Sequence, residues 1–437
     1  MDAAAVPLRS AHPARQVAAF AALGGLAACS AAIVAGAEAG LDQLVPAAKE
    51  AYPGWLRGPL SALGIDMGPA ALGWLLVAMS ACYLLALASA DSIPVRAGIG
   101  AVVGLHALFL VAPPLLSSDV FGYIDAARLG ALHGVSPYAP GDTPLPPDAV
   151  HLYRRWGTDL PSPYGPLFVL LSYALVPLGI AGGLWVFKAL TAAGSLATVW
   201  LVWRCAVLLG RDPLKAALFV GLNPIVLLFA VGGAHNDFFA LPLIAGAVYL
   251  ALLGRERLTG AALVAAAAIK LPLGLPLAFA AARAGARRRD LAKGALIAVA
   301  VVTVVSLIVF GSEAVSFVRE IRQQQDRTAL YSVPNQVGEA LGLGGITDGI
   351  RLAAGAVLAA ALALALRAAW RGADWIAAAG WATFALLVTS AWLLPWYLAW
   401  LFPLAAIAGD RRLRLASLAL AAYVIVTRVE LWTSLPG

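Results

Sequence analysis

Long apolar segments follow one another along most of the chain, and no other feature restricts its possible folds as strongly. A helix needs about 20 apolar residues to cross a bilayer, and segments of about this length recur from residue 16 to residue 433. Hydrophobic residues make up 62% of the chain and charged residues 12%, against about half and about a quarter in a soluble domain. The sequence therefore excludes a water-soluble enzyme and a disordered chain, and it predicts an all-α, polytopic membrane protein.

Hydropathy predicts about 11 full spans within a single membrane domain, residues 1–437. A further apolar segment, 259–283, carries Lys270-Leu271-Pro272 at its middle. Proline interrupts a helix, so we expect two short helices here that form a hairpin and return to the same side, which brings the total to about 13 membrane helices. The predicted spans are approximately 16–37, 69–90, 97–113, 184–208, 215–232, 237–253, 293–311, 348–367, 375–391, 395–409 and 413–433.

Positive charge gathers in the short connections between spans, and the formal net charge is +7. Clusters such as Arg287-Arg288-Arg289 are typical of cytoplasmic loops rather than of nucleic-acid-binding surfaces. They predict a multi-pass protein of the cytoplasmic membrane with a cytoplasmic N-terminus. The first span also fits a cleaved signal peptide, but the charge pattern favours its retention. The three cysteines lie inside apolar segments and predict neither a disulfide framework nor a zinc site: Cys29, Cys82 and Cys205.

This orientation places three segments outside the membrane: about 38–68, the outer loop 114–183 and a second outer loop, 312–347. The loop 114–183 is rich in Asp, Pro, Gly and Tyr, and a long polar loop between short connections is more often functional than filler. Its apolar part, 166–182, is expected to be a juxtamembrane helix. Asp125 and Arg128 are three residues apart on one predicted helix, so we expect a local ion pair between them.

Asp119 stands just past the outer end of the third span. A carboxylate at the membrane boundary is partly desolvated and binds a proton more readily, so Asp119 is a candidate general base for a hydroxyl that arrives from the aqueous side. The alternative is structural, because Ser118 or Asp119 can cap a helix over 120–132.

Lysines inside membrane segments are costly unless they are paired, and they are candidates for function by default. Lys270, at the apex of the predicted hairpin, is our first candidate for binding a phosphate, with snorkelling to the surface as the alternative. Lys188 lies near the outer end of its span and can snorkel more easily than Lys270.

The connection Gly232-Gly233-Ala234-His235-Asn236-Asp237 joins two spans on the outer side. Its His, Asn and Asp side chains can hydrogen-bond to sugar hydroxyls or phosphate-linked groups, although glycine and Asn or Asp are also ordinary helix-capping residues. Arg322 and Arg327 in the second outer loop can contact an anion or face solvent. Trp396 and Tyr397 can stack on sugar rings or belong to an interfacial aromatic belt.

Eight motifs occur in one order between about residues 115 and 403. Together they resemble the integral-membrane GT-C glycosyltransferases that use polyprenyl-phosphate sugars, and most of all the polyprenyl-phosphomannose-dependent α-mannosyltransferases of actinobacterial lipoglycan assembly. Each motif alone is weak, but the ordered set is fairly specific. The motifs are Ser118-Asp119-Val120-Phe121-Gly122-Tyr123, Gly134-Val135-Ser136-Pro137-Tyr138, Ser162-Pro163-Tyr164-Gly165-Pro166-Leu167, Asn223-Pro224, Gly232-Gly233-Ala234-His235-Asn236-Asp237, Ile269-Lys270-Leu271-Pro272, Ser332-Val333-Pro334-Asn335 and Leu394-Pro395-Trp396-Tyr397.

The resemblance implies an inverting glycosyltransferase at the outer face of the cytoplasmic membrane. It implies a polyprenyl-phosphate sugar donor, with mannose expected, and a glycan or glycolipid acceptor; membrane lipid surrounds the protein and no nucleic acid is bound. Asp119 holds the position of the base, and Lys270, His235, Arg322 and Arg327 are expected to bind the donor phosphate. No cofactor is expected to be required; some relatives have a paired acidic motif, but no second acid stands beside Asp119, so the sequence does not support the alternative of a divalent metal ion. Expected substrate contacts are Tyr123, Tyr138, Tyr164, Asn236, Asp237, Trp396 and Tyr397.

Two other functions are compatible with the composition. A lipid or glycolipid transporter predicts polar residues near the bilayer midplane and repeat-related broken helices, whereas the polar residues here gather at the outer boundary. A non-catalytic assembly subunit leaves Lys270 unexplained.

Overall fold

The computed structural model describes residues 13–39, 44–46, 53–154, 161–316 and 326–428. These residues form helices and connections and contain no β-strand, as the sequence predicts. The α-helices are α1 (Pro13–Glu38), α2 (Pro69–Ala88), α3 (Val95–Val111), α4 (Asp119–His133), α5 (Pro166–Tyr173), α6 (Gly179–Leu208), α7 (Pro213–Gly221), α8 (Asp237–Leu252), α9 (Glu256–Ile269), α10 (Pro276–Arg283), α11 (Arg288–Phe310), α13 (Val333–Ala340), α14 (Asp348–Trp370), α15 (Trp375–Thr389), α16 (Phe402–Ile407) and α17 (Arg411–Arg428).

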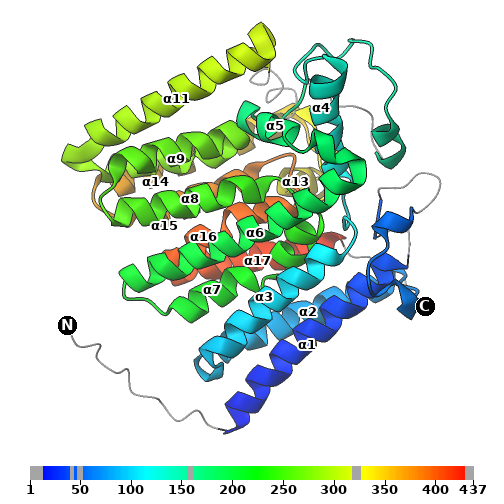
Figure 1. Cartoon of the computed structure of the whole chain (residues 1–437). Helices are drawn as coiled ribbons and strands as arrows, with labels where there is room; N and C mark the ends of the chain where they lie inside the picture. Colours follow the sequence, from blue (N-terminus) through cyan, green and yellow to red (C-terminus); the bar gives the residue numbers. More distant parts are fainter. Residues whose placement is uncertain (1–12, 40–43, 47–52, 155–160, 317–325, 429–437) are drawn as a thin grey trace.

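The long helices lie side by side in a tilted bundle (Figure 1). One edge is formed by α1, α2 and α3 and the other by α11, with α6, α8 and α9 between them. Four helices of the C-terminal part, α14 to α17, lie behind this layer, and α4 and α5 lie together at one end of the bundle. Segments distant in the sequence therefore meet at that end.

In the part of the chain that the structure describes, five helical segments are long and apolar enough to cross a membrane, and they contain α1, α2, α6, α11 and α14. A bent pair, α7 and the π-helix η6 (Ile225–Gly232), adds a sixth candidate, with an angle of 52° between its two parts. These spans support a membrane protein, but the helix lengths do not confirm the expected 11 full spans. One predicted span, 395–409, is divided between the 3₁₀-helix η10 (Pro395–Trp400) and α16.

The bend after α7 follows from Asn223-Pro224. The Asn223 carboxamide oxygen accepts the Ile225 N–H at 2.9 Å, and its amide nitrogen donates to the Tyr83 hydroxyl at 3.3 Å. Pro224 has no N–H to donate to the preceding turn. The predicted span 215–232 is therefore present as a bent pair of helices, because the Asn223 side chain replaces the helical hydrogen bond at the break.

The predicted hairpin is present. The first helix, α9, ends at Ile269, Lys270 takes an extended conformation, and α10 follows the short 3₁₀ turn η7 (Leu271–Gly274). The far ends meet, because the Arg283 guanidinium donates to the Glu256 carboxylate and to the Ala251 carbonyl, both at 2.7 Å. The break therefore holds Lys270 at the apex, as the sequence predicts.

Ion pairs hold the segment after α4 onto that helix. Arg128 Nε lies 3.0 Å and His133 Nε2 2.9 Å from the Asp148 carboxylate, and Asp125 pairs with Arg154. The expected local pair of Asp125 with Arg128 is therefore wrong, because each finds a partner from the loop. Burial alone would raise the pKa of Asp148, but hydrogen bonds from the Val150 N–H, His133 and Arg128 hold it below its ordinary value.

The apolar segment 166–182 does not cross the bundle as a span. The helix α5 has eight residues, the short turn η5 (Val176–Leu178) follows it, and α6 begins at Gly179. A methyl group at Gly165 would overlap the Ala268 carbonyl, and the Gly165 N–H donates to the Ile269 carbonyl at 3.0 Å. Glycine at this position therefore brings the start of α5 directly against the break that carries Lys270.

Candidate active site

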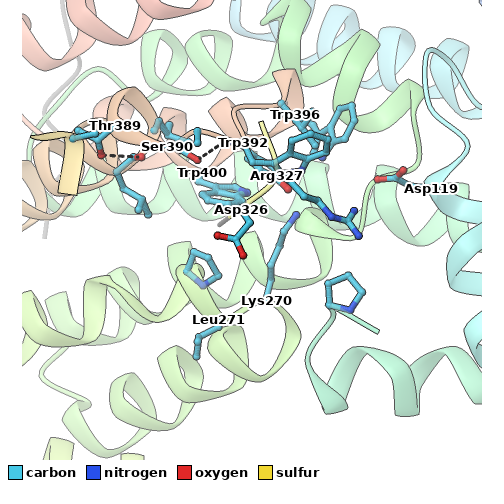
Figure 2. A pocket seen from close by; sticks show the side chains of 18 of the residues that line it. Asp119, Lys270, Leu271, Asp326, Arg327, Thr389, Ser390, Trp392, Trp396 and Trp400 are labelled. Carbon is cyan, nitrogen blue, oxygen red and sulfur yellow. Dashed lines mark hydrogen bonds between the residues drawn. The ribbon is translucent and has the colours of Figure 1, made fainter. Parts of the chain in front are cut away.

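A partly open cavity of about 1020 Å³ lies where α4, the hairpin apex and the C-terminal helices meet. Asp119 and Lys270 both line it, and Figure 2 shows them facing the same space from different elements. Five charged side chains line the cavity: Asp119, Lys270, Asp326, Arg327 and Arg351. The two residues on which the sequence reading depended therefore converge on one cavity.

Asp119 is the first residue of α4, and its side chain is 30% exposed. Its N–H donates to the Ser117 hydroxyl at 3.1 Å, while Ser118 at the N-cap position makes no capping hydrogen bond through its side chain. The alternative of a side-chain cap by Ser118 is therefore not observed, and the Ser117 hydroxyl accepts the first N–H of the helix instead. The Asp119 carboxylate lines the cavity, where a substrate hydroxyl can reach it.

Lys270 is held by a buried carboxylate and by aromatic rings. Its Nζ atom lies 2.8 Å from Oδ1 of Asp237, 4.4 Å from the ring centre of Tyr397 and 5.2 Å from that of Trp400. The side chain is 11% exposed, and the residue lines the cavity. The ammonium thus has a counter-ion and aromatic faces that stabilise its charge inside the protein. Lys270 therefore does not snorkel to the surface.

The connection before α8 lies one layer behind the cavity wall. His235, Asn236 and Asp237 are all fully buried, and none of them lines the cavity. His235 Nδ1 lies 3.5 Å from Oδ2 of Asp119, and its ring stacks on Trp396 with 3.7 Å between the ring centres. Asp237 also accepts a hydrogen bond from the indole N–H of Trp400. The same connection therefore contacts both Asp119 and Lys270 from behind.

The expected substrate-binding aromatic residues fall into two groups. Tyr164, Trp396 and Tyr397 line the cavity. Tyr123 and Tyr138 are fully buried and do not line it; the Tyr123 hydroxyl accepts the Asn236 N–H at 3.5 Å, and the Tyr138 hydroxyl donates to the Tyr164 carbonyl at 2.8 Å. The second group positions the residues around the cavity in this structure.

One cation on the cavity wall was missed by the sequence reading. Arg351, in the first turn of α14, donates to the Asp326 carbonyl at 3.0 Å and to the Thr328 hydroxyl at 2.8 Å, and thereby fixes the segment that carries Arg327. The sequence does contain a signal for this residue, because Arg351 is a cation one turn inside the predicted span 348–367, and such residues are candidates for function. Arg322, the other arginine expected near the phosphate, lies outside the described residues.

The arrangement has the groups needed to join a hydroxyl to a phosphate-linked sugar. A partly exposed carboxylate can accept a proton, three cations can face a phosphate, and Trp392, Trp396 and Tyr397 offer aromatic faces. Within the described ranges, no group of three or more His, Cys, Asp or Glu side chains is placed to hold a metal ion.

Family models match most of the chain. The model described as the N-terminal domain of alpha-(1->6)-mannopyranosyltransferase matches residues 20–286. This chain belongs to the alpha-(1->6)-mannopyranosyltransferase family. A second model, the MptB C-terminal domain, matches residues 327–429. The two matches include the elements that carry Asp119, Lys270, Arg327 and Arg351, so the cavity is formed by both matched parts.

Individual relatives carry related names. The chain is 28% identical over 346 residues to alpha-(1->6)-mannopyranosyltransferase B of Corynebacterium glutamicum, covering 68% of this chain and 56% of that protein. It is 28% and 30% identical to the A enzymes of Mycobacterium tuberculosis and Corynebacterium glutamicum, covering 39% and 36% of this chain and 33% and 32% of those proteins. The chain thus spans about half the length of the first relative and about a third of the others. No solved structure matches the chain.

Proposed function

We propose that this protein is an inverting mannosyltransferase that takes its sugar from a polyprenyl-phosphate donor at the outer face of the cytoplasmic membrane. The observation that carries the proposal is the convergence of Asp119 and Lys270 on one cavity. Family membership supports a mannosyl transfer and favours it over the transporter and the assembly subunit. The helical bundle is compatible with a GT-C fold, which we propose on the ordered motifs.

The proposed reaction is a single displacement. The Asp119 carboxylate takes the proton of the acceptor hydroxyl while the oxygen attacks the anomeric carbon on the face opposite the phosphate. The bond between that carbon and the phosphate oxygen breaks, and the polyprenyl phosphate leaves with the electron pair. A β-linked donor therefore gives an α-linked product, which agrees with the alpha linkage in the names of the relatives.

The leaving phosphate gains negative charge as the bond breaks, and preorganised cations stabilise such charge most effectively. Lys270 is rigidly placed by Asp237 and Tyr397, and Arg327 is held on the same wall by the contacts that Arg351 makes with its neighbours. These side chains supply the compensating charge, so we expect transfer without a divalent metal ion.

An apolar part of the cavity wall is suited to the polyprenyl chain. It is formed by α14 and the end of α15, and no residue of the apolar window of α14 is buried inside the protein. A helix whose surface is exposed along its length faces lipid when the protein is in a membrane, so a lipid donor can enter the cavity from the bilayer beside α14. The apolar lining residues here are Ile346, Ala354, Gly355, Leu358, Leu386 and Leu387.

The test is a donor comparison with the purified protein in liposomes. We expect transfer from polyprenyl-phosphate mannose to a mannan or glycolipid acceptor, with an α-linked product and no loss in the presence of EDTA. Because the apolar wall contacts the lipid, the KM for the donor should fall as the polyprenyl chain lengthens. Transfer from a nucleotide sugar alone, or a product of retained anomeric configuration, would contradict the proposal.

A further inference from the structure

Lys188, on α6, is the second ammonium inside the bundle, and the mechanism proposed above does not use it. The residue is fully buried, and its Nζ atom donates to the carbonyl oxygen of Gly232 at 3.0 Å. Lys188 does not snorkel to the surface, because its side chain points into the protein. Among the described residues it forms no ion pair, and an ammonium in a membrane segment without a carboxylate needs a functional reason.

The Gly232 carbonyl joins two parts of the site. It accepts the Leu115 N–H at 3.1 Å as well as the hydrogen bond from Lys188. Leu115 lies four residues before Asp119, and Gly232 lies five residues before Asp237, the counter-ion of Lys270. A single buried oxygen therefore links the segment that carries the proposed base to the connection that supports the proposed phosphate-binding cation.

The two linked segments both contain strained backbone. Leu116 has a φ of 60° and Ala234 a φ of 56°, and no other non-glycine residue in the described part of the chain has a positive φ. Residues in this conformation persist only where the surroundings hold them, and they gather at functional sites. Leu116 directly follows Leu115, and Ala234 is two residues from Gly232, so both strained residues flank the contact that Lys188 makes.

The helix α6 packs against both ends of the connection 232–237. Six residues after Lys188, Gly194 packs so closely on Phe238 that a methyl group there would overlap the Phe238 carbonyl. Residues 188 and 194 are less than two helical turns apart on α6. Lys188 thus contacts the beginning of the connection, and Gly194 contacts the residue after its end.

We infer that Lys188 is a positioning residue for the transfer reaction, whose ammonium fixes the Gly232 carbonyl and thereby sets Asp119 and Lys270 relative to each other. The inference rests on the proposed function for its kinetic part. Catalytic groups displaced by about 1 Å can lose roughly 100-fold in rate. Lys188→Met, which keeps the length of the side chain and removes the donor, should therefore lower kcat by roughly 10- to 100-fold and leave the KM for the donor nearly unchanged.

The control is Ser195→Ala on the same helix. Ser195 is also fully buried, and its hydroxyl lies 2.8 Å from His106 Nε2, so this variant loses a buried hydrogen bond of α6 that does not involve the site. We expect Ser195→Ala to keep the wild-type kcat. If Lys188→Met does not accumulate, it should be made together with Ala234→Gly, because glycine adopts the left-handed conformation without strain.

A second readout does not depend on activity. Hydrogen–deuterium exchange should become faster in Lys188→Met within peptides that cover 113–119 and 230–238, and it should not change there in Ser195→Ala. Unchanged exchange in these peptides would overturn the positioning role, as would a wild-type kcat in Lys188→Met. A wild-type protein that transfers no sugar would count against the proposed function alone, because the exchange result still decides the role of Lys188.

Discussion

The pairing of Lys270 with Asp237 can be tested by removing each partner alone and then both. The two charges lie 2.8 Å apart, and Asp237 is fully buried. At an effective dielectric constant of about 20, their attraction amounts to about 6 kcal/mol, and the loss of hydration offsets part of it. Removing one partner of such a pair leaves the other charge buried and typically costs roughly 3–5 kcal/mol.

We therefore expect Asp237→Asn and Lys270→Met each to lower the free energy of unfolding by roughly 3–5 kcal/mol. The double variant leaves no lone charge, so its loss should be smaller than either single loss, and the coupling energy should exceed the larger single loss, roughly 3–5 kcal/mol. Denaturant titrations in mixed micelles measure the free energy of unfolding of the wild-type protein, the two single variants and the double variant, and these four values give the coupling energy. Sugar transfer should be abolished in the double variant despite its recovered stability, because the cation that faces the phosphate is gone.

An exposed pair serves as the matched control. Arg257 and Asp290 lie 2.9 Å apart, but their side chains are 65% and 46% exposed. Solvent screens such a pair, so Asp290→Asn should cost less than about 1 kcal/mol. Additive losses in the Lys270 and Asp237 cycle, or normal transfer by the double variant, would refute the assignment of Asp237 as the counter-ion of a functional lysine.

Three further predictions concern the segments around the cavity. Hydrogen bonds hold the pKa of Asp148 below its ordinary value. The contribution of Asp148 to stability should therefore be complete above about pH 4 and be lost as the pH falls further. Thermal melts of Asp148→Asn should lack this pH dependence. Gly165→Ala should lower the melting temperature, since the methyl group overlaps the α9 backbone, whereas Gly104→Ala, with open space around it, should raise it slightly. Arg351→Gln should raise the KM for the donor by roughly 10- to 100-fold, as expected for a lost hydrogen bond to a charged group, while Arg367→Gln, at the other end of the same helix, should leave it unchanged.

Each of these three predictions, for Asp148, Gly165 and Arg351, can be contradicted by a different result. A melt of the wild-type protein that is flat below pH 4 would remove the role of Asp148 in holding the outer loop. Tolerance of Gly165→Ala would mean that α5 can move away from the hairpin break. An unchanged donor KM in Arg351→Gln would leave that residue a purely structural contact of α14.

Much of the helical pattern could be predicted from the sequence, because apolar segment length and proline position determine it directly. The hairpin break at Lys270 was predicted for this reason. Asn223-Pro224 indicates a turn, but the apolar segment continues across it, so the bend inside the span 215–232 was not predicted. Element lengths were harder to predict, because buried helices inside the bundle need not be long enough to cross a membrane.

The candidate site was predictable at the level of which motifs meet, but not at the level of which side chains reach the cavity. Lys270 and Asp119 line it, whereas His235 and Asp237 lie behind it. A sequence motif shows that polar residues gather at a turn, but only the packing of α6 and η10 against that turn decides which way they point. Lys188 illustrates the limit, since its distance from the helix end suggested snorkelling and its surroundings give it a carbonyl partner.

The most direct test of the account is the turnover of Asp119→Asn with polyprenyl-phosphate mannose, measured together with binding of the lipid donor. Asparagine has nearly the same shape but accepts no proton, so kcat should fall by roughly 10²- to 10⁴-fold, with donor binding retained through Lys270, Arg327 and Arg351. Turnover close to that of the wild-type protein would show that the proton goes elsewhere and that the cavity is not used as proposed.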